Sequence, residues 1–200
     1  MSGPLHKDYA GAKLGMWIFL FTELLLFGGL FLLYATYLTR YPREFTAAGR
    51  EMHLFLGAAN TAILITGSFF AAMAVTAIQR DERRRVMWLL SGAVLSGAVF
   101  LFNKYLEWSA EIGNGIYPGS PRLVAGSPGE SVFFSLYYLT VGLHGLHVLI
   151  GGTFLTIVAV RVHRGTIHAG NYILLENSAL YWHLVDLIWI FIFPLYYLIL

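Results

Sequence analysis

An acidic residue stands inside the first long apolar segment of the chain, where a charge is costly. Glu23 lies nine positions after Leu14, among leucine and phenylalanine residues. At 1.5 Å per residue it would lie about 15 Å into a helix that crosses a membrane. A bare carboxylate at that depth costs several kcal/mol, so we expect Glu23 to be protonated, paired or solvated. Two roles are open: proton exchange or lipid contact, and a hydrogen bond that joins two helices.

Histidine and aspartate recur with helical spacing in the last two apolar segments. His144 and His147 are three residues apart, and His183 and Asp186 repeat that spacing. The two members of each pair therefore lie on one face of their helix. Counted by helical rise, His147, His183 and Asp186 fall within about one turn of the depth of Glu23. We expect these side chains to form one polar layer across a helical bundle.

Two carboxylates and three histidines at similar depth also suggest a metal site. Helical bundles build di-metal centres from inward-facing acids and repeated Glu-x-x-His pairs. The chain lacks those repeated pairs. Hydrogen bonding between helices is therefore the expected role of the histidines, and no metal site or catalytic residue is predicted.

Further charged residues stand near the ends of apolar segments. Lys104 and Glu107 are three residues apart, so they are expected to pair, or to extend their charged groups to the membrane interface. Arg161 and Arg164 close the fourth apolar segment. A basic cluster there suits anionic lipid head groups, and a simple orientation signal explains it equally well.

The apolar segments that carry these residues predict membrane-spanning helices. Of the 200 residues, 58% are hydrophobic and 12% are charged, whereas soluble domains carry about 25% charged residues. A span needs about 20 apolar residues, and helices satisfy their own backbone groups within lipid. Residues 1–200 are therefore expected to form one all-α, polytopic transmembrane domain. Its five predicted spans are Leu14–Leu38, Leu54–Ile78, Val86–Leu106, Val132–Val160 and Leu174–Leu200.

The placement of lysine and arginine predicts the orientation of the spans. If the N-terminus is cytoplasmic, the eight basic residues on the inside are Lys7, Lys13, Arg80, Arg83, Arg84, Arg85, Arg161 and Arg164. The five on the outside are then Arg40, Arg43, Arg50, Lys104 and Arg122. This excess favours a cytoplasmic N-terminus and a periplasmic C-terminus.

The remaining composition narrows the class of protein further. The segment from Glu111 to Glu130 is rich in glycine and proline and predicts an irregular surface loop. Small residues within the spans predict close helix packing. The chain has no cysteine, which excludes disulfides and thiolate-bound metals, and its net charge of +2 does not suggest a nucleic-acid partner.

Short motifs in all five spans occur in the order found in one known family. The matching segments are Gly15–Glu23, Asn60–Thr61, Glu107–Trp108, Gly142–Val148, Gly152–Leu155 and Tyr181–Trp189. Two of them contain His-Gly-Leu-His and Trp-His-x-x-Asp-x-x-Trp. With these motifs the chain resembles subunit III of the haem-copper oxidases.

The resemblance implies a subunit that binds no haem or copper, because the family places both in partner subunits I and II. It implies packing mainly against subunit I, phospholipids held in a cleft, and support of proton uptake. By the same resemblance Glu23 matches a buried glutamate that faces the cleft, and Arg161 matches an arginine that contacts lipid phosphate. Mitochondrial-type members have two further spans at the start, and Pro194 is expected to interrupt the fifth span here.

We therefore expect the non-catalytic subunit III of a bacterial respiratory oxidase, a multi-pass protein of the inner membrane. The cytochrome c type, which couples O2 reduction to proton translocation, is favoured. The alternatives are subunit III of a bo-type quinol oxidase and the homologue that accompanies some nitric oxide reductases. The electron donor is not encoded here, because its site belongs to other subunits. A free-standing transporter is disfavoured, since the chain shows neither repeated halves nor a substrate site.

Overall fold

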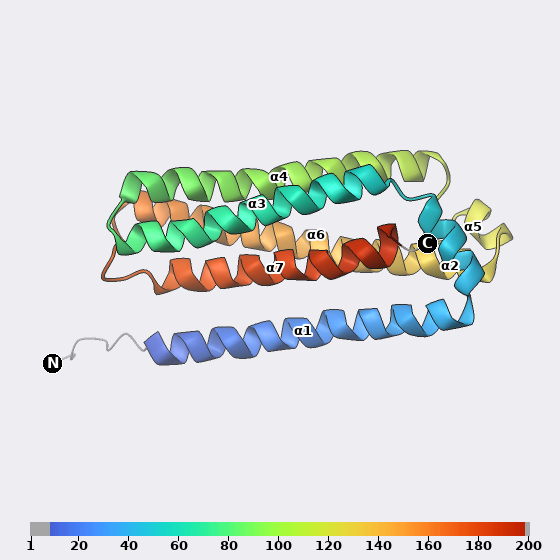
Figure 1. The fold of residues 1–200 in the computed structure, drawn as a ribbon, viewed down its shortest axis with the longest axis horizontal. Helices are drawn as coiled ribbons and strands as arrows, with labels where there is room; N and C mark the ends of the chain where they lie inside the picture. The colour runs from blue at the N-terminus through green and yellow to red at the C-terminus, as the bar shows by residue number, and fades with distance from the viewer. Residues whose placement is uncertain (1–8, 199–200) are drawn as a thin grey trace.

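The computed structural model describes residues 9–198, which form seven α-helices and no β-strand (Figure 1). Five helices are long and apolar enough to cross a membrane: α1 (Tyr9–Arg40), α3 (Leu54–Gln79), α4 (Arg83–Gly113), α6 (Pro128–His163) and α7 (Ile173–Tyr197). Two short helices, α2 (Pro42–Arg50) and α5 (Pro121–Ala125), lie together at one end. The predicted all-α, five-span class is confirmed. Lys7 and the last two residues of the predicted fifth span, Ile199 and Leu200, lie outside the described residues.

Four of the long helices enclose the interior, and α1 lies along one side of them (Figure 1). α1 contacts α6 and α7 but neither α3 nor α4. In their most apolar stretches, 11% of the α1 residues are buried within the chain, against 56% of those in α7. An apolar helix surface is stable against lipid, so α1 needs few protein contacts. Glu23 therefore stands on the most exposed of the five spans.

Small residues let the four inner helices approach closely around a tryptophan of α7. Trp182 is 1% exposed. A Cβ added at Gly97 of α4 would lie 2.6 Å from its ring, and one added at Gly151 of α6 would lie 3.0 Å from it. Lipid provides no hydrophobic drive for helix association, so this close contact supplies van der Waals attraction between the helices.

Helix α4 is longer than its predicted span, Val86–Leu106, and runs from Arg83 to Gly113. The apolar run ends near Leu106 because polar residues follow it in the sequence. Glu107 and Glu111 are nevertheless 2% and 8% exposed. The helix continues because its polar residues face the interior of the protein, where other helices supply partners.

The segment from Glu111 to Glu130 is more ordered than the predicted irregular loop. It contains α5, which buries Leu123 to 1% exposure. The hydroxyl of Ser120 accepts a hydrogen bond from the Leu123 amide, and that of Ser127 accepts one from the Glu130 amide, both at 3.2 Å. Both serines thus cap helices, and Pro at the first helical position favours each start. The prediction of a wholly irregular loop was wrong.

A proline inside α7 also departs from expectation. Pro194 was expected to interrupt the fifth span, but α7 continues through it to Tyr197. The amide of Leu198 donates to the carbonyl of Pro194 at 3.3 Å, and the hydroxyl of Tyr34 donates to the carbonyl of Leu195. Neighbouring side chains in membrane bundles often satisfy backbone groups near a proline.

The connections α3–α4 and α6–α7 lie at the same end of the bundle as the start of α1 (Figure 1). The side chain of Arg83 joins them, because it donates a hydrogen bond to the carbonyl of His163. We call this end, which carries Arg80–Arg85 and Arg161–Arg164, the basic end. Its cytoplasmic location, and with it the orientation of both termini, stays a prediction.

Candidate functional site: polar side chains inside the bundle

Glu23 and His147 form a hydrogen-bonded pair between α1 and α6. The Oε2 atom of Glu23 lies 2.8 Å from Nε2 of His147, and the side chains are 14% and 9% exposed. Nδ1 of His147 lies 2.7 Å from the carbonyl oxygen of Leu143. A carbonyl only accepts, so Nδ1 carries hydrogen. The Glu23–His147 bond then contains one shared proton, either on the carboxyl group or on an imidazolium.

Aromatic rings enclose the histidine side of this pair. The ring of Phe27 meets His147 edge-on with centroids 5.2 Å apart, and Tyr181 stacks near it at 6.4 Å. Phe19 in turn stacks on Tyr181 at 5.9 Å. These rings exclude water from one side of the pair, whereas Glu23 stands on the exposed helix α1. The arrangement can hold a proton at the edge of the bundle where α1 packs.

Among the described residues, His183 and Asp186 make no hydrogen bond to the Glu23–His147 pair. Nδ1 of His183 lies 2.5 Å from the hydroxyl of Ser68, which joins α7 to α3. Asp186 is 8% exposed, and its buried Oδ1 has no hydrogen-bond partner in the described part of the chain. His147 and His183 thus bond to different helices, and the single polar layer stays a prediction.

His144 does not make the interhelical hydrogen bond that was expected of it. Its side chain is fully buried, and neither ring nitrogen has a hydrogen-bond partner among residues 9–198. It lies instead between aromatic rings, with centroids 5.4 Å from Phe100 and 5.1 Å from Trp189. The spacing of His144 and His147 predicted that they share one helix face. It did not predict that they would have different neighbours.

Lys104 and Glu107 form an ion pair that is buried inside the bundle. Nζ of Lys104 lies 2.8 Å from Oε2 of Glu107, with side-chain exposures of 7% and 0%. The second oxygen, Oε1, accepts from the hydroxyls of Tyr137 at 2.8 Å and Tyr197 at 2.6 Å. Lys104 also donates to the Tyr197 hydroxyl. Both carboxylate oxygens of Glu107 are therefore satisfied by side chains of three helices.

Two members of this network and a neighbouring buried acid were absent from the sequence-based prediction. Tyr137 and Tyr197 carry no local signal, because their partners come from other helices. Glu111 could have been found, since it follows Glu107 by four residues and so shares its face. Oε2 of Glu111 is buried and has no hydrogen-bond partner among the described residues.

Arg161 and Arg164 differ in position at the basic end. Arg161 lines a cavity of about 410 Å³ between the ends of α1, α6 and α7, together with Tyr9 and Asn171. Arg164 does not line this cavity, although it follows within one helical turn. In the described residues, no three His, Cys, Asp or Glu side chains lie where they could hold one metal ion.

The fold and these polar groups define a class: a multi-pass helical membrane protein with hydrogen-bonded acids and histidines inside its bundle. The sequence profile of the family described as "Cytochrome c oxidase subunit III" matches residues 6–199. The chain therefore belongs to the cytochrome c oxidase subunit III family, the third subunit of haem-copper oxidases.

Three similar proteins illustrate the range of this family. "Cytochrome c oxidase subunit 3" of Thermostichus vulcanus is 35% identical over 97% of this chain and 89% of its own length. "Probable quinol oxidase subunit 3" of Staphylococcus epidermidis is 30% identical over 94% and 88%. "Heme-copper oxidase subunit I+III" of Aeropyrum pernix is 31% identical over 98% of this chain, which matches 23% of that longer protein.

Proposed function

We propose that the chain is the non-catalytic subunit III of a bacterial respiratory cytochrome c oxidase. The observation that carries this proposal is the 35% identity to a cytochrome c oxidase subunit 3 over nearly the whole chain. The complex reduces O2 and translocates protons across the inner membrane. Haem and copper belong to subunits I and II, and this chain supports them from outside the redox site.

A quinol oxidase is the second candidate. The staphylococcal quinol oxidase subunit 3 matches over 94% of this chain at 30% identity. The two candidates differ in the electron donor, which binds to other subunits. Purification of the complex distinguishes them: a cytochrome c oxidase oxidises reduced cytochrome c, whereas a quinol oxidase oxidises quinol and not cytochrome c.

Subunit I is the principal partner in this proposal. The Aeropyrum pernix relative, by its name, joins subunits I and III in one chain, and such a fusion favours two parts that are neighbours. Subunit II and further subunits are the other expected members of the complex. The apolar outer surface of the bundle offers ample area for such contacts.

Gentle removal of the chain from its complex tests the non-catalytic role. The remaining complex should keep its full haem spectrum and its copper content, and its initial rate of O2 reduction should be retained. We expect slower proton uptake and faster loss of activity during turnover. Loss of haem absorbance in proportion to the chain removed would contradict the proposal.

Phospholipid binding at Arg161 is the second part of the proposed role. Arg161 lines the 410 Å³ cavity at the basic end, and a guanidinium group binds phosphate through charge-assisted hydrogen bonds. Arg161→Ala should reduce the anionic lipid that co-purifies with the complex, measured by mass spectrometry. Arg164→Ala is the matched control, because Arg164 does not line the cavity. Equal lipid loss in both variants would reject Arg161 as the specific ligand.

The proposed topology places the basic end in the cytoplasm and the C-terminus in the periplasm. A reporter fused after Leu200 should therefore be active only in the periplasm. A cytoplasmic signal from that fusion would reverse the orientation.

A further inference from the structure

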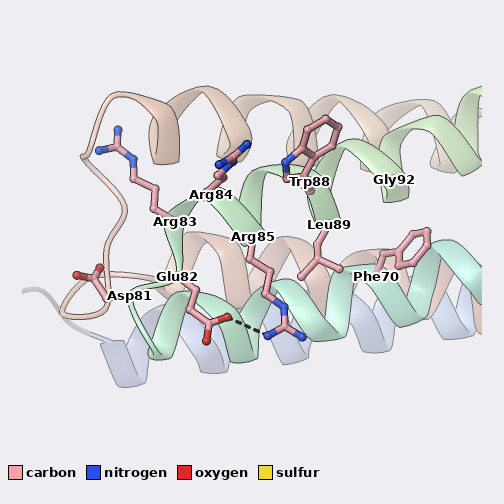
Figure 2. Close-up of a pocket in the computed structure, with 9 residues that line it drawn as sticks. All are labelled: Phe70, Asp81, Glu82, Arg83, Arg84, Arg85, Trp88, Leu89 and Gly92. Carbon is pink, nitrogen blue, oxygen red and sulfur yellow. Dashed lines mark hydrogen bonds and ion pairs between the residues drawn. The ribbon is translucent and has the colours of Figure 1, made fainter.

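Another cavity at the basic end lies on the opposite connection, where α3 turns into α4. It has a volume of about 790 Å³ and is shown in Figure 2. Its lining combines the charged residues of the turn, Asp81–Arg85, with Phe70, Trp88, Leu89 and Gly92 of the two helices. None of these residues belongs to the polar pairs described above or to the cavity at Arg161.

The charged part of this cavity has an excess of positive charge. Three guanidinium groups and two carboxylates line it, which leaves one net positive charge. Arg83 is engaged with the carbonyl of His163, and Arg85 pairs with Glu82 at 3.0 Å. Figure 2 shows that Arg84 points away from the Glu82–Arg85 pair. Arg84 has no ion-pair or hydrogen-bond partner for its side chain among the described residues, so its five N–H donors are available to a ligand.

A second, apolar cavity of about 360 Å³ adjoins the first between α3 and α4, and Phe70 and Gly92 line both. We call this second cavity the α3–α4 groove. Its other lining residues are Ala62, Ile63, Thr66, Leu95, Ser96 and Val99. The hydroxyls of Thr66 and Ser96 bond to carbonyls of their own helices, at 2.8 and 2.7 Å. The groove therefore presents an apolar wall even where its residues are polar.

The two adjoining cavities together have the length of one leaflet of a membrane. Arg84 and Val99 are fifteen positions apart on α4, which corresponds to about 22 Å along the helix. Half of a bilayer, with its head-group region, is also about 20–22 Å thick. Trp88 is 71% exposed and lies one turn beyond Arg84, at the depth where interfacial tryptophans occur.

We propose that this site binds one anionic glycerophospholipid, with its phosphodiester at Arg84 and one acyl chain in the α3–α4 groove. A phosphodiester carries one negative charge and matches the net charge of the lining. The planar guanidinium of Arg84 binds two phosphate oxygens at once. Arg83 fixes the site to the α6–α7 connection, and Arg85 keeps Glu82 away from the phosphate. The site is separate from the one at Arg161 and does not depend on the type of oxidase.

Titration of phosphatidylglycerol into the delipidated complex, in nanodiscs of phosphatidylcholine, tests the head-group contact. A cationic side chain near a membrane surface contributes about 1 kcal/mol to anionic lipid binding, so Arg84→Gln should weaken binding about fivefold. Arg50→Gln is the matched control, because Arg50 is exposed on α2 at the other end of the bundle. Equal affinities in the two variants would overturn the proposal.

A second pair of variants tests the groove without a change of charge. Ala62 lines the groove, whereas Ala72 is exposed on the same helix and lines neither cavity. Ala62→Trp should fill the groove and lower the retained phosphatidylglycerol several-fold, and Ala72→Trp should leave it unchanged. Equal retention of phosphatidylglycerol in both variants would show that no acyl chain occupies the groove.

Two further measurements separate a lipid from other occupants. Water-soluble glycerol 3-phosphate should fail to displace phosphatidylglycerol, since it lacks the acyl chain. Displacement at similar concentration would identify a free-phosphate site instead.

A photo-reactive residue at position 88 should cross-link to lipid in the intact complex, and cross-linking to another subunit instead would identify a protein interface. Haem content and initial O2 reduction should be unaffected by Arg84→Gln, so failure here leaves the subunit III assignment intact.

Discussion

The bundle contains two hydrogen-bonded acids whose surroundings differ in almost every respect. Glu107 is bonded through both oxygens to Lys104, Tyr137 and Tyr197, and its side chain is fully buried. Glu23 has one hydrogen-bonded partner, His147, and stands on α1, the helix with the fewest buried residues. The first acid is fixed from three sides, whereas the second is held from one side.

The difference separates a structural role from a role in proton exchange. All the donors around Glu107 are oriented toward a carboxylate, so gain or loss of a proton would disrupt several bonds at once. The Glu23–His147 bond contains a single proton between two groups that can each hold it. Loss of that proton disrupts only one interhelical bond. This contrast motivates the hypothesis that the Glu107 network serves stability and the Glu23–His147 pair serves proton exchange, which the variants below test.

The largest expected effect comes from breaking the Lys104–Glu107 pair. Lys104→Met removes the cation and leaves the buried carboxylate uncompensated, which typically costs about 3–5 kcal/mol of folding free energy. We expect a large fall in the denaturation temperature of the purified protein, measured by circular dichroism. The double variant Lys104→Met with Glu107→Leu should recover much of the loss, because no isolated charge remains. A stable single variant would show that the pair is not structural.

A smaller effect is expected when the charge of Glu107 alone is removed. Glu107→Gln keeps an oxygen that can accept from Lys104, but it leaves this buried cation without a counter-charge. The expected loss is about 3 kcal/mol, at the lower end of the cost of breaking a buried ion pair, because the amide still satisfies hydrogen-bonding groups around it. Glu51→Gln is the control, because it removes a glutamate charge from an exposed ion pair, which contributes little to stability. If both variants lose equal stability, the hydrogen bonds to Glu107 do not account for its effect.

The same comparison shows which parts of the structure are predictable from the sequence. The length of an apolar run is a local property, so the five spans were predicted correctly. Helical rise predicted a similar depth for Glu23, His147, His183 and Asp186, but it did not single out His147 as the partner of Glu23. Rise alone does not give helix rotation, however. It could not show that His147 faces α1 whereas His144 lies between Phe100 and Trp189.

The features that the sequence did not predict depend mostly on contacts between residues that are far apart in the chain. Lys104 and Glu107 were expected either to pair or to reach the interface, because nothing nearby in the sequence indicates Tyr137 and Tyr197. Helix α2 was overlooked for another reason. It has Pro42 at its start and buries Phe45 to 0% exposure, but its nine residues are too few to appear in a search for spans.

The effect of Glu23→Gln should appear in function more than in stability. Glutamine keeps the size of the side chain and can donate an N–H to Nε2 of His147, so the complex should assemble normally. It cannot release a proton. We expect slower proton uptake and a shorter lifetime of activity during turnover, measured on reconstituted complex. Unchanged uptake and lifetime would leave Glu23 as an interhelical bond alone.

The smallest effect is expected at a second ion pair of the same length. Nζ of Lys13 on α1 lies 2.8 Å from Oε1 of Glu176 on α7, the same N–O distance as in the Lys104–Glu107 pair. The side chains are 46% and 28% exposed, however, against 7% and 0% for the buried pair. Water and salt screen an exposed pair, and holding two long side chains in place costs entropy, so its net contribution is small.

Lys13→Gln should accordingly leave the denaturation temperature unchanged at physiological ionic strength. Its effect, if resolved at low salt, should vanish as salt is added, whereas the loss caused by Lys104→Met should persist. Equal and salt-independent losses in the two variants would show that distance rather than burial sets the strength of ion pairs in this protein. That result would also undermine the distinction between Glu107 and Glu23, since the same argument from burial supports both comparisons.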